Sequence, residues 1–469
     1  MPELPIVPEL PIVLDRTGGR PLAVQVAEAV REATVVGVLR PGERLPSTRD
    51  LAGRLGVSRS VTAAAYDQLL AEGWIEGRHG SGTYVTEVPP APRNRPARRR
   101  TAPAAPTVDL YAGSASPGTI DPAAWRRAWR AAADAPVPGR HERAGLTSMR
   151  VAVAEHLLRH RGLVVGPDAV LATAGTSAAV GEFAVAALRP GDRVGMEEPG
   201  YQRATAAFRG AGVEVVPVPV DHHGLVVSAI PAGVRAVYCT PAHQYPLGAR
   251  MPADRRVALV RRARDERFWV LEDDYDGEFR FDVAPLPLLA ALAPDAVVHL
   301  GTASKILTPG LGTGWLAGPP AVVAALEEHR RRTATQPSPA GQQVLTALIE
   351  HGDLARHLRR LRRVLAERRA LVVDAVRAAG FTATGDAAGA HVVVPLPSAA
   401  AERAAVTGGA AAGLALDGLA RHHLGSPDRY GLVLGYAGVE TGPLRRALPV
   451  LAGVLRAAVD GDRRSVRPE

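Results

Sequence analysis

The first ninety residues alternate apolar and polar positions with the period of an α-helix, in three short blocks. Pro21, Ser47 and Ser58 precede the blocks, and Gly56 and Gly73 end the second and third, as start and stop signals of helices do. The sequence therefore predicts three helices. Their apolar positions are Leu22, Val26, Val30 and Ala33, then Leu51 and Leu55, then Val61, Ala65 and Leu69.

Two short β-type segments follow, Trp74-Ile75 and Thr83-Tyr84-Val85, with Gly77, Gly80 and Gly82 between them. Aromatic and β-branched residues on both sides of a glycine-rich turn predict a hairpin. Two helices joined by a tight turn and followed by a hairpin predict a winged helix-turn-helix, whose second helix enters the DNA major groove. The alternative interpretation is a small helical fold with no role in DNA binding.

The start of the third predicted helix carries side chains that suit DNA. Serine hydroxyls there can reach phosphates, and Arg59 can form two hydrogen bonds with a guanine. An arginine in the preceding helix suits a phosphate or base contact, and the wing tip suits the minor groove or the backbone. The residues predicted to contact DNA are Arg49, Ser58, Arg59, Ser60, His79 and Gly80.

This segment resembles a known family of bacterial regulators. The stretches PGERLPSTRDLA, GVSRSV and GSGTYV match motif positions of the winged-helix domain of the GntR family. The resemblance covers roughly residues 14–86 and implies binding to a double-stranded DNA operator.

From about residue 145 the chain alternates helical patterns with short, continuous apolar runs. Runs of this kind predict a mostly parallel sheet that is covered by helices on both faces. Ligands of such sheets bind at the carboxyl ends of the strands. The predicted strands include 170–173, 193–196, 213–220, 236–239, 269–271 and 297–300.

Between these two patterns lies a segment that cannot build a core. Residues 88–107 hold six prolines and five arginines and no carboxylate, which predicts an extended, solvated linker. The predicted domains are thus a DNA-binding domain at 14–87, a linker at 88–107 and a large domain at 108–469. The linker is either a plain spacer or a spacer whose arginines also touch DNA phosphates.

Composition adds three constraints. The formal charge of +9 suits a polyanionic partner such as nucleic acid. The single cysteine, Cys239, excludes an intrachain disulfide and fits a reducing cytoplasm, where we expect the protein. The sequence contains no run of 18 or more apolar residues, so it predicts no membrane span.

Lys305 is the only lysine among 56 basic residues, and it follows the small residues Gly301–Ser304. An amine forms a Schiff base with an aldehyde, whereas a guanidinium does not. A chain that uses arginine almost everywhere and keeps one lysine therefore suggests covalent attachment of pyridoxal 5′-phosphate at Lys305.

Other polar clusters at predicted strand ends suit the same cofactor. Residues 174–177 follow a strand and open a helix, whose amide groups can hold a phosphate. Asp273 and Tyr275 lie two apart and so share a face, where a carboxylate and a phenol can bond a pyridine nitrogen and a ring hydroxyl. Thr302 can add a hydroxyl to the phosphate. Taken alone, the acidic cluster could equally be an exposed strand end.

These clusters, in this order, resemble the fold type I aminotransferases. The stretches EEPGY, TPAHQYPLG, EDDYDGEFRF and GTASK match best, and a winged helix joined to such a domain resembles the MocR subfamily of GntR regulators. The resemblance covers residues 14–460. It implies a smaller C-terminal α+β subdomain, a head-to-tail homodimer, and a large domain that serves as a sensor and carries no catalytic residues.

The resemblance also implies roles for individual residues. Lys305 would hold the cofactor covalently, Asp273 would face the pyridine nitrogen and Tyr275 the ring hydroxyl. Side chains near the phosphate and in the effector pocket would complete the site. These are Thr176, Ser177 and Thr302 for the phosphate, Tyr201 and Arg203 for the effector, and Tyr245 where many aminotransferases have asparagine.

The chain departs from the family pattern at two positions. Gly312 stands where an arginine usually grips the phosphate, a loss of roughly 1.5–3 kcal/mol. Val433 stands where aminotransferases have the arginine that binds the substrate carboxylate, so the bidentate clamp is missing. Both losses favour a sensor of the cofactor over efficient transamination.

The sequence thus predicts a pyridoxal-phosphate-responsive transcriptional regulator of vitamin B6 or amino-acid metabolism genes. One alternative is an active aminotransferase with a tethered DNA-binding domain, and another is a DNA-binding protein that no longer holds the cofactor. His391 either faces the cofactor pocket or is a structural histidine. The spacing of the fourteen histidines predicts no metal site.

Overall fold

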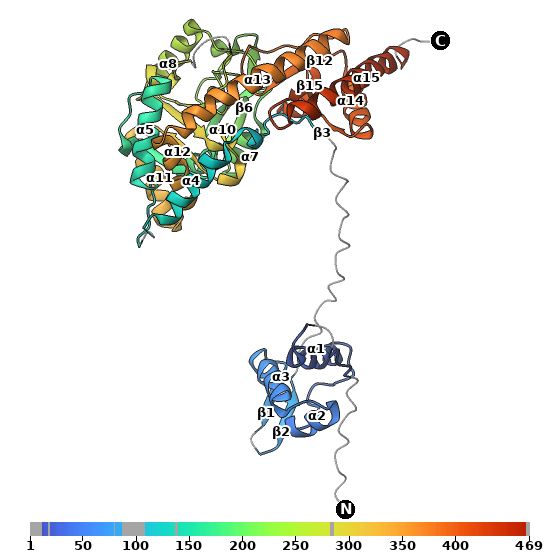
Figure 1. The fold of residues 1–469 in the computed structure, drawn as a ribbon. Helices are drawn as coiled ribbons and strands as arrows, with labels where there is room; N and C mark the ends of the chain where they lie inside the picture. Colours follow the sequence, from blue (N-terminus) through green and yellow to red (C-terminus); the bar gives the residue numbers. More distant parts are fainter. Residues whose placement is uncertain are drawn as a thin grey trace, which may run out of the picture. The chain divides into compact units, whose positions relative to one another are not determined.

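The computed structural model describes residues 12–465, apart from 17–18, 79, 87–107, 137–138 and 282–285. The chain divides into two compact units, Met1–Pro103 and Ala104–Glu469. Figure 1 labels the helices and strands of each. The predicted linker at 88–107 lies outside the described residues, which resume at Val108 with the strand β3 (Val108–Asp109).

The N-terminal unit contains the three predicted helices and the predicted hairpin. Ser47 caps the second helix by accepting a hydrogen bond from the amide of Asp50 at 3.1 Å, and Gly56 ends it in the left-handed conformation. Apolar residues from all five elements form one small core. The elements are α1 (Leu22–Val35), α2 (Thr48–Leu55), α3 (Arg59–Ala71), β1 (Ile75–Arg78) and β2 (Gly82–Val85).

The buried face of α3 differs by one position from the predicted one. Val61 is only half-buried, whereas Thr62 and Tyr66 are buried. Their hydroxyls explain this face, because the hydroxyl of Thr62 donates to the carbonyl of Thr48 at 2.7 Å and that of Tyr66 to the carbonyl of Pro46 at 2.8 Å. These bonds tie α3 to the start of α2, so the helix-turn-helix is held as one rigid piece.

Replacing Tyr66 by phenylalanine should lower the free energy of unfolding of the N-terminal unit by about 1 kcal/mol, because the buried carbonyl of Pro46 then loses its donor. Hydrogen exchange of the α3 amides in the full-length chain measures this directly. Tyr84→Phe is the control, since the Tyr84 hydroxyl bonds the exposed Ser81. Equal protection in both variants would contradict the assignment.

The large unit is built on an eight-stranded sheet in the order β4-β11-β10-β9-β8-β5-β6-β7. The five central strands, β10, β9, β8, β5 and β6, are parallel to one another. The strands β11 and β7 run antiparallel to the strands beside them. The predicted mostly parallel sheet is therefore confirmed. The strands are β4 (Val170–Thr173), β5 (Arg193–Glu198), β6 (Glu214–Asp221), β7 (Gly224–Leu225), β8 (Ala236–Cys239), β9 (Trp269–Asp273), β10 (Val297–Thr302) and β11 (Gly314–Ala317).

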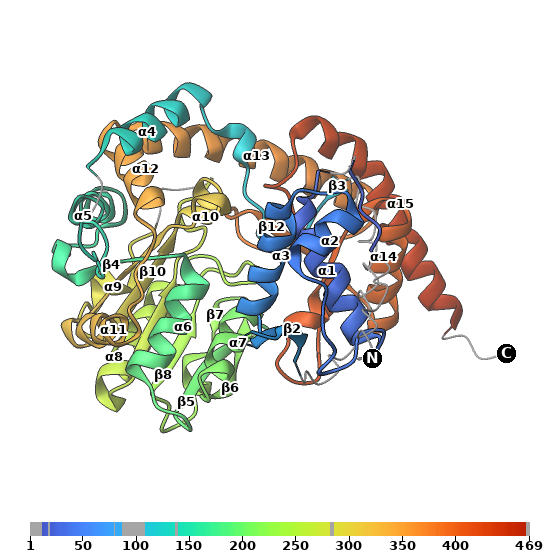
Figure 2. The same ribbon diagram turned by 90° about the horizontal axis from the view of Figure 1, so that it is seen from below.

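Helices cover both faces of this sheet. Phe183 of α6, Phe208 of α7 and Leu326 of α11 belong to the core on one face, whereas α5, α8 and α12 contribute to the larger core on the other. Figure 2 shows this layered arrangement. The helices are α4 (Pro122–Asp134), α5 (Thr147–Arg161), α6 (Thr176–Ala187), α7 (Gln202–Gly210), α8 (Ala253–Glu266), α9 (Leu289–Leu292), α10 (Ala303–Ile306), α11 (Pro320–Thr333), α12 (Pro339–Glu350) and α13 (Asp353–Ala378).

The C-terminal part forms the smaller α+β subdomain. Its antiparallel sheet has the order β12-β15-β14, and β13 pairs in parallel with β3 from the start of the unit. Within the described residues, no helix is both long and apolar enough to cross a membrane. The elements are β3 (Val108–Asp109), β12 (His391–Leu396), α14 (Ala399–Ala411), β13 (Leu414–Ala415), β14 (Asp417–Gly418), β15 (Tyr430–Gly435) and α15 (Thr441–Ser465).

Candidate functional site

Lys305 lies directly after β10, in the short helix α10, at the carboxyl end of the sheet. Its Nζ donates to the carbonyl of Gly113. Burial lowers the pKa of Lys305, the charge of Arg203 lowers it further, and Asp273 acts in the opposite direction. A lowered pKa enlarges the neutral fraction of the amine, which is the nucleophilic form.

Asp273 ends β9 and faces the same pocket. The hydroxyl of Tyr238 donates to its Oδ2, while Oδ1 is buried and has no partner within the described residues. Burial raises the pKa of Asp273 to about 7, against the lowering effect of Tyr238. The neighbouring Asp274 instead pairs with the buried Arg161. Oδ1 of Asp273 is thus the acceptor that remains for a donor on a ligand.

Three tyrosines form an aromatic wall next to these groups. The ring of Tyr245 meets the rings of Tyr201 and Tyr275 edge-on, with centroids 5.8 and 5.9 Å away. The hydroxyl of Tyr201 is 3.0 Å from Oγ of Ser177, and the hydroxyl of Tyr275 donates to the carbonyl of His243 at 3.0 Å. The structure therefore brings together Tyr201, Tyr245 and Tyr275, three residues that the sequence analysis assigned to the cofactor and effector site.

The start of α6 forms a cradle of small residues and hydroxyls. Oγ1 of Thr176 is buried and has no partner within the described part of the chain. A Cβ placed on Gly175, whose φ is +117°, would lie 3.5 Å from Oγ1 of Thr302 and 3.7 Å from Oγ of Ser304. The helix amides and these hydroxyls converge, which is the usual arrangement for binding a phosphate. The sequence analysis missed Ser304.

The structure describes both positions at which the chain departs from the family pattern, Gly312 and Val433. Gly312 has a φ of +57°, and no atom lies within 4 Å of a Cβ built on it. Val433 is fully buried in β15 and packs with Val393 and Leu419. These packed side chains are apolar, so they offer no partner for a carboxylate.

His391 is buried at the start of β12, and its ring meets that of Tyr245 edge-on at 5.5 Å. Its Nε2 donates to the carbonyl of Pro246 at 2.9 Å. Both sequence-based interpretations hold in part, since His391 is hydrogen-bonded and adjoins the aromatic wall.

On the N-terminal unit, Ser58, Arg59 and Ser60 are exposed at the start of α3, and Arg49 is exposed on α2. Gly80 is exposed in the wing, while His79 lies outside the described residues. The sequence analysis did not single out Arg78, whose guanidinium lies over the ring of Tyr84 at 4.5 Å. Its position in β1 puts a further cation on the wing.

Comparisons with known proteins agree with this description. Residues 110–414 match the family "Aminotransferase class I and II", and residues 22–85 match "Bacterial regulatory proteins, gntR family". The chain is 36% identical over 370 residues to the "HTH-type pyridoxine biosynthesis transcriptional regulator PdxR" of Corynebacterium glutamicum, covering 78% of this chain and 81% of the relative.

A second relative covers nearly the whole length. It is the "Probable rhizopine catabolism regulatory protein MocR" of Rhizobium meliloti, 32% identical over 95% of this chain and 96% of its own. Among solved structures, a multiple substrate aminotransferase from Thermococcus profundus superposes with a TM-score of 0.69 at 23% identity, over 76% of this chain and 92% of its own. This likeness shows the fold of the large unit.

Proposed function

From its membership of the MocR subfamily of GntR-type transcriptional regulators, we propose that the chain is a sensor of pyridoxal 5′-phosphate. Members of this subfamily join a winged helix to an aminotransferase class I and II domain. The similarity to a regulator of pyridoxine biosynthesis supports the proposal that this chain controls vitamin B6 genes. A regulator of this kind acts where the chromosome is, in the cytoplasm.

One observation carries the proposal: buried polar atoms without a partner among the described residues lie near the chain's single lysine. The charge of Asp273 acts on the pKa of Lys305, and the cradle at the start of α6 adjoins Thr302 and Ser304, just before that lysine. When bound, pyridoxal phosphate supplies an aldehyde that condenses with a neutral amine. Burial of Lys305 keeps part of that amine neutral. Oδ1 of Asp273 would accept a hydrogen bond from the pyridine nitrogen, and Oγ1 of Thr176 would donate to the phosphate. The residues present therefore fit the cofactor.

The remaining site residues complete this proposal. Tyr275 would bond the ring hydroxyl, and Ser177 and Thr302 would join Thr176 around the phosphate. Tyr201 and Arg203, with Tyr245 beside them, would line the effector side. Arg203 already acts on the pKa values of Lys305 and Tyr201, so its charge lies close to both.

We propose that the large unit senses the cofactor and does not turn over an amino acid, because Val433 replaces the arginine that would bind the substrate carboxylate. A transaminase must hold the carboxylate of an amino acid, and the buried apolar wall around Val433 cannot pair that charge. The competing function is an active aminotransferase, which the fold of the large unit favours. Sustained transamination of any amino acid by the purified chain would establish that alternative.

Sensing requires that cofactor binding and DNA binding influence one another. A ligand shifts a conformational equilibrium only through its different affinity for the two states. We propose that the protein acts as a head-to-tail homodimer whose two winged helices bind operator repeats, and that the cofactor changes the balance between two dimer conformations.

The experiment is a DNA-binding assay on the chain's own upstream region, with and without pyridoxal phosphate. We expect the apparent dissociation constant to change with the cofactor, and a scrambled DNA of equal length controls for charge effects. An identical operator affinity in both conditions would defeat the proposed coupling while leaving DNA binding itself intact.

Gly312→Arg should tighten cofactor binding by roughly 10-fold. A charged hydrogen bond to the phosphate contributes about 1.5–3 kcal/mol, and a non-glycine residue in the left-handed conformation costs about 1 kcal/mol. Titration of the apoprotein with pyridoxal phosphate, followed by absorbance, measures the affinity.

Gly162→Arg is the matched control for that variant, because Gly162 also has a left-handed φ, +66°, and open space around its Cβ. It ends α5, whereas Gly312 follows β10 and α10 in the chain. Equal effects of the two substitutions, or weaker binding by Gly312→Arg, would contradict the assignment of position 312 to the phosphate site.

A further inference from the structure

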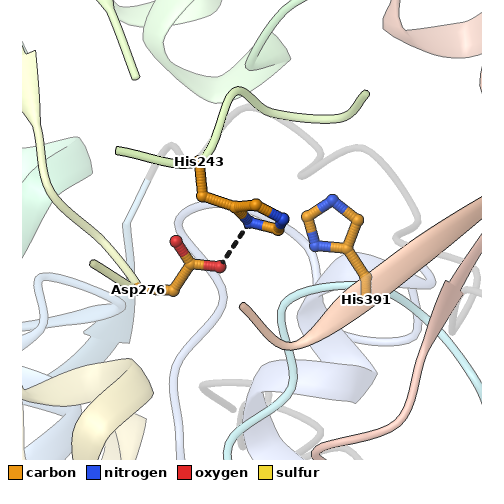
Figure 3. A group of neighbouring side chains, drawn as sticks. All are labelled: His243, Asp276 and His391. Carbon is orange, nitrogen blue, oxygen red and sulfur yellow. Dashed lines mark hydrogen bonds and ion pairs between the residues drawn. The ribbon is translucent and has the colours of Figure 1, made fainter. Parts of the chain in front are cut away.

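Three buried side chains from different elements meet beside the aromatic wall. His243 follows β8, Asp276 follows β9 and His391 begins β12. Their exposed fractions are only 1%, 2% and 1%, and one potential ligand atom from each lies within 4.8 Å of the others. Figure 3 shows the ring of His243 between the carboxylate of Asp276 and the ring of His391.

The hydrogen bonds of the two imidazoles fix where their lone pairs lie. A carbonyl can only accept, so Nε2 of His391 carries the proton that it donates to Pro246 at 2.9 Å. In the neutral ring this tautomer leaves a lone pair on Nδ1. Nδ1 of His243 lies 2.9 Å from Oδ2 of Asp276. A metal ion held by both Nδ1 of His243 and the carboxylate of Asp276 would take the place of the proton between them. Nε2 of His243, which is buried and has no partner within the described residues, would then carry the proton of the neutral ring.

The carboxylate of Asp276 has little compensation besides the Coulomb attraction of Lys305. Its ion-pair partner among the described residues is His243, which carries charge only when protonated, and its Oδ1 is buried without a hydrogen bond. Buried charges in proteins are paired or coordinate metals. Two imidazole lone pairs and a weakly compensated carboxylate thus share one small volume.

Glycines keep this volume tightly enclosed. A Cβ on Gly389 would lie 2.2 Å from Cε1 of His243 and 2.7 Å from Oδ2 of Asp276, and a Cβ on Gly248 would lie 3.1 Å from Nε2 of His243. Larger residues at either position would displace the imidazole. The backbone therefore approaches His243 from two sides and fixes its ring.

We propose that His243, Asp276 and His391 form a binding site for a divalent transition-metal ion of the zinc class. Two histidine nitrogens and a carboxylate oxygen are ligands that zinc uses, and atoms bound to one tetrahedral zinc lie roughly 3.3 Å apart. In the structure the candidate atoms lie within 4.8 Å of one another, and binding would draw the side chains of Asp276 and His391 closer to the enclosed ring of His243. The hydroxyl of Tyr275 lies 3.2 Å from Nδ1 of His243, so the metal adjoins the pocket of Lys305, although the proposal does not depend on cofactor binding.

The test is metal binding by the full-length chain after treatment with a chelator. Zn²⁺ is titrated calorimetrically, and Co²⁺ is titrated by its visible absorbance, with metal content measured by mass spectrometry. We expect one ion per chain. His391→Ala should weaken binding roughly 10-fold or more, since even the loss of a group that hydrogen-bonds a metal ligand has that effect.

His223→Ala is the control, because His223 is exposed next to His222, with ring centroids 4.0 Å apart, and could bind metal adventitiously. It should leave the stoichiometry unchanged. If His391→Ala does not fold by circular dichroism, Asp276→Asn serves as the second variant. Absence of stoichiometric binding by the wild type, or equal loss in His391→Ala and His223→Ala, would overturn the proposal.

Discussion

Replacing Lys305 by alanine should abolish the visible absorbance of bound pyridoxal phosphate and the effect of the cofactor on operator affinity. Lys305 is the only lysine of the chain, so no neighbouring amine can take over the covalent attachment. Without the covalent bond, the remaining contacts at Asp273 and the α6 cradle leave weaker, reversible binding. Absorbance spectra and operator titrations of the wild type and the variant measure both effects.

Lys305→Arg separates charge from chemistry in this experiment. The guanidinium keeps the positive charge but cannot condense with an aldehyde, so we expect the same spectral loss as with alanine. Operator binding without cofactor should stay at the wild-type level in both variants, because the winged helix contains no lysine. A retained absorbance band in either variant would refute the assignment of Lys305.

The parts of the fold that the sequence predicted are those with local signals. Ser47 and Gly56 bound α2 as expected because capping and left-handed glycine depend on neighbouring residues only. On α3 the predicted Ala65 and Leu69 are buried, but Val61 is only half-buried, and the prediction omitted the buried Thr62 and Tyr66. Their hydroxyls give no apolar signal in the sequence. Their burial depends on carbonyls of Thr48 and Pro46, which only the folded turn provides.

The candidate site shows the same difference between local signals and contacts that only the folded chain provides. Asp273, Tyr275 and Lys305 were predictable because strand-end position and residue type are visible in the sequence. The partners that orient them were not predictable. Tyr238 reaches Asp273 from the neighbouring strand β8, 35 positions away in the chain, and Gly113 reaches Lys305 over 192 positions. Spacing along the chain cannot reveal such contacts, since the sheet and the subdomain bring them together.

The cluster of His243, Asp276 and His391 illustrates this limit most clearly. The first two residues, His243 and Asp276, lie 33 positions apart and follow adjacent strands. The order of the strands in the sheet would be enough to predict that they lie close together. His391 comes from the subdomain and meets them only after the two parts pack. Metal-ligand spacing in the sequence therefore gave no signal there.

Replacing Arg59 by alanine should weaken operator binding by about 1–3 kcal/mol for each half-site, since an arginine that forks onto a guanine contributes that much. Within the described residues, its guanidinium forms no ion pair, and it is exposed at the start of α3. A dimer that binds two half-sites loses the contact twice. Operator titration at fixed salt, with random DNA in parallel, measures the change.

Random DNA separates two roles of this arginine. If Arg59 reads a base, binding to random DNA falls much less than binding to the operator; if it holds a phosphate, both fall equally and the salt dependence becomes shallower by about one unit. Arg261→Ala is the control, because Arg261 lies on α8 of the large unit with 83% of its side chain exposed, and its removal changes the net charge by the same amount. Operator affinity equal to that of Arg261→Ala would contradict a role for Arg59 in DNA recognition, and with it the assignment of α3 as the recognition helix.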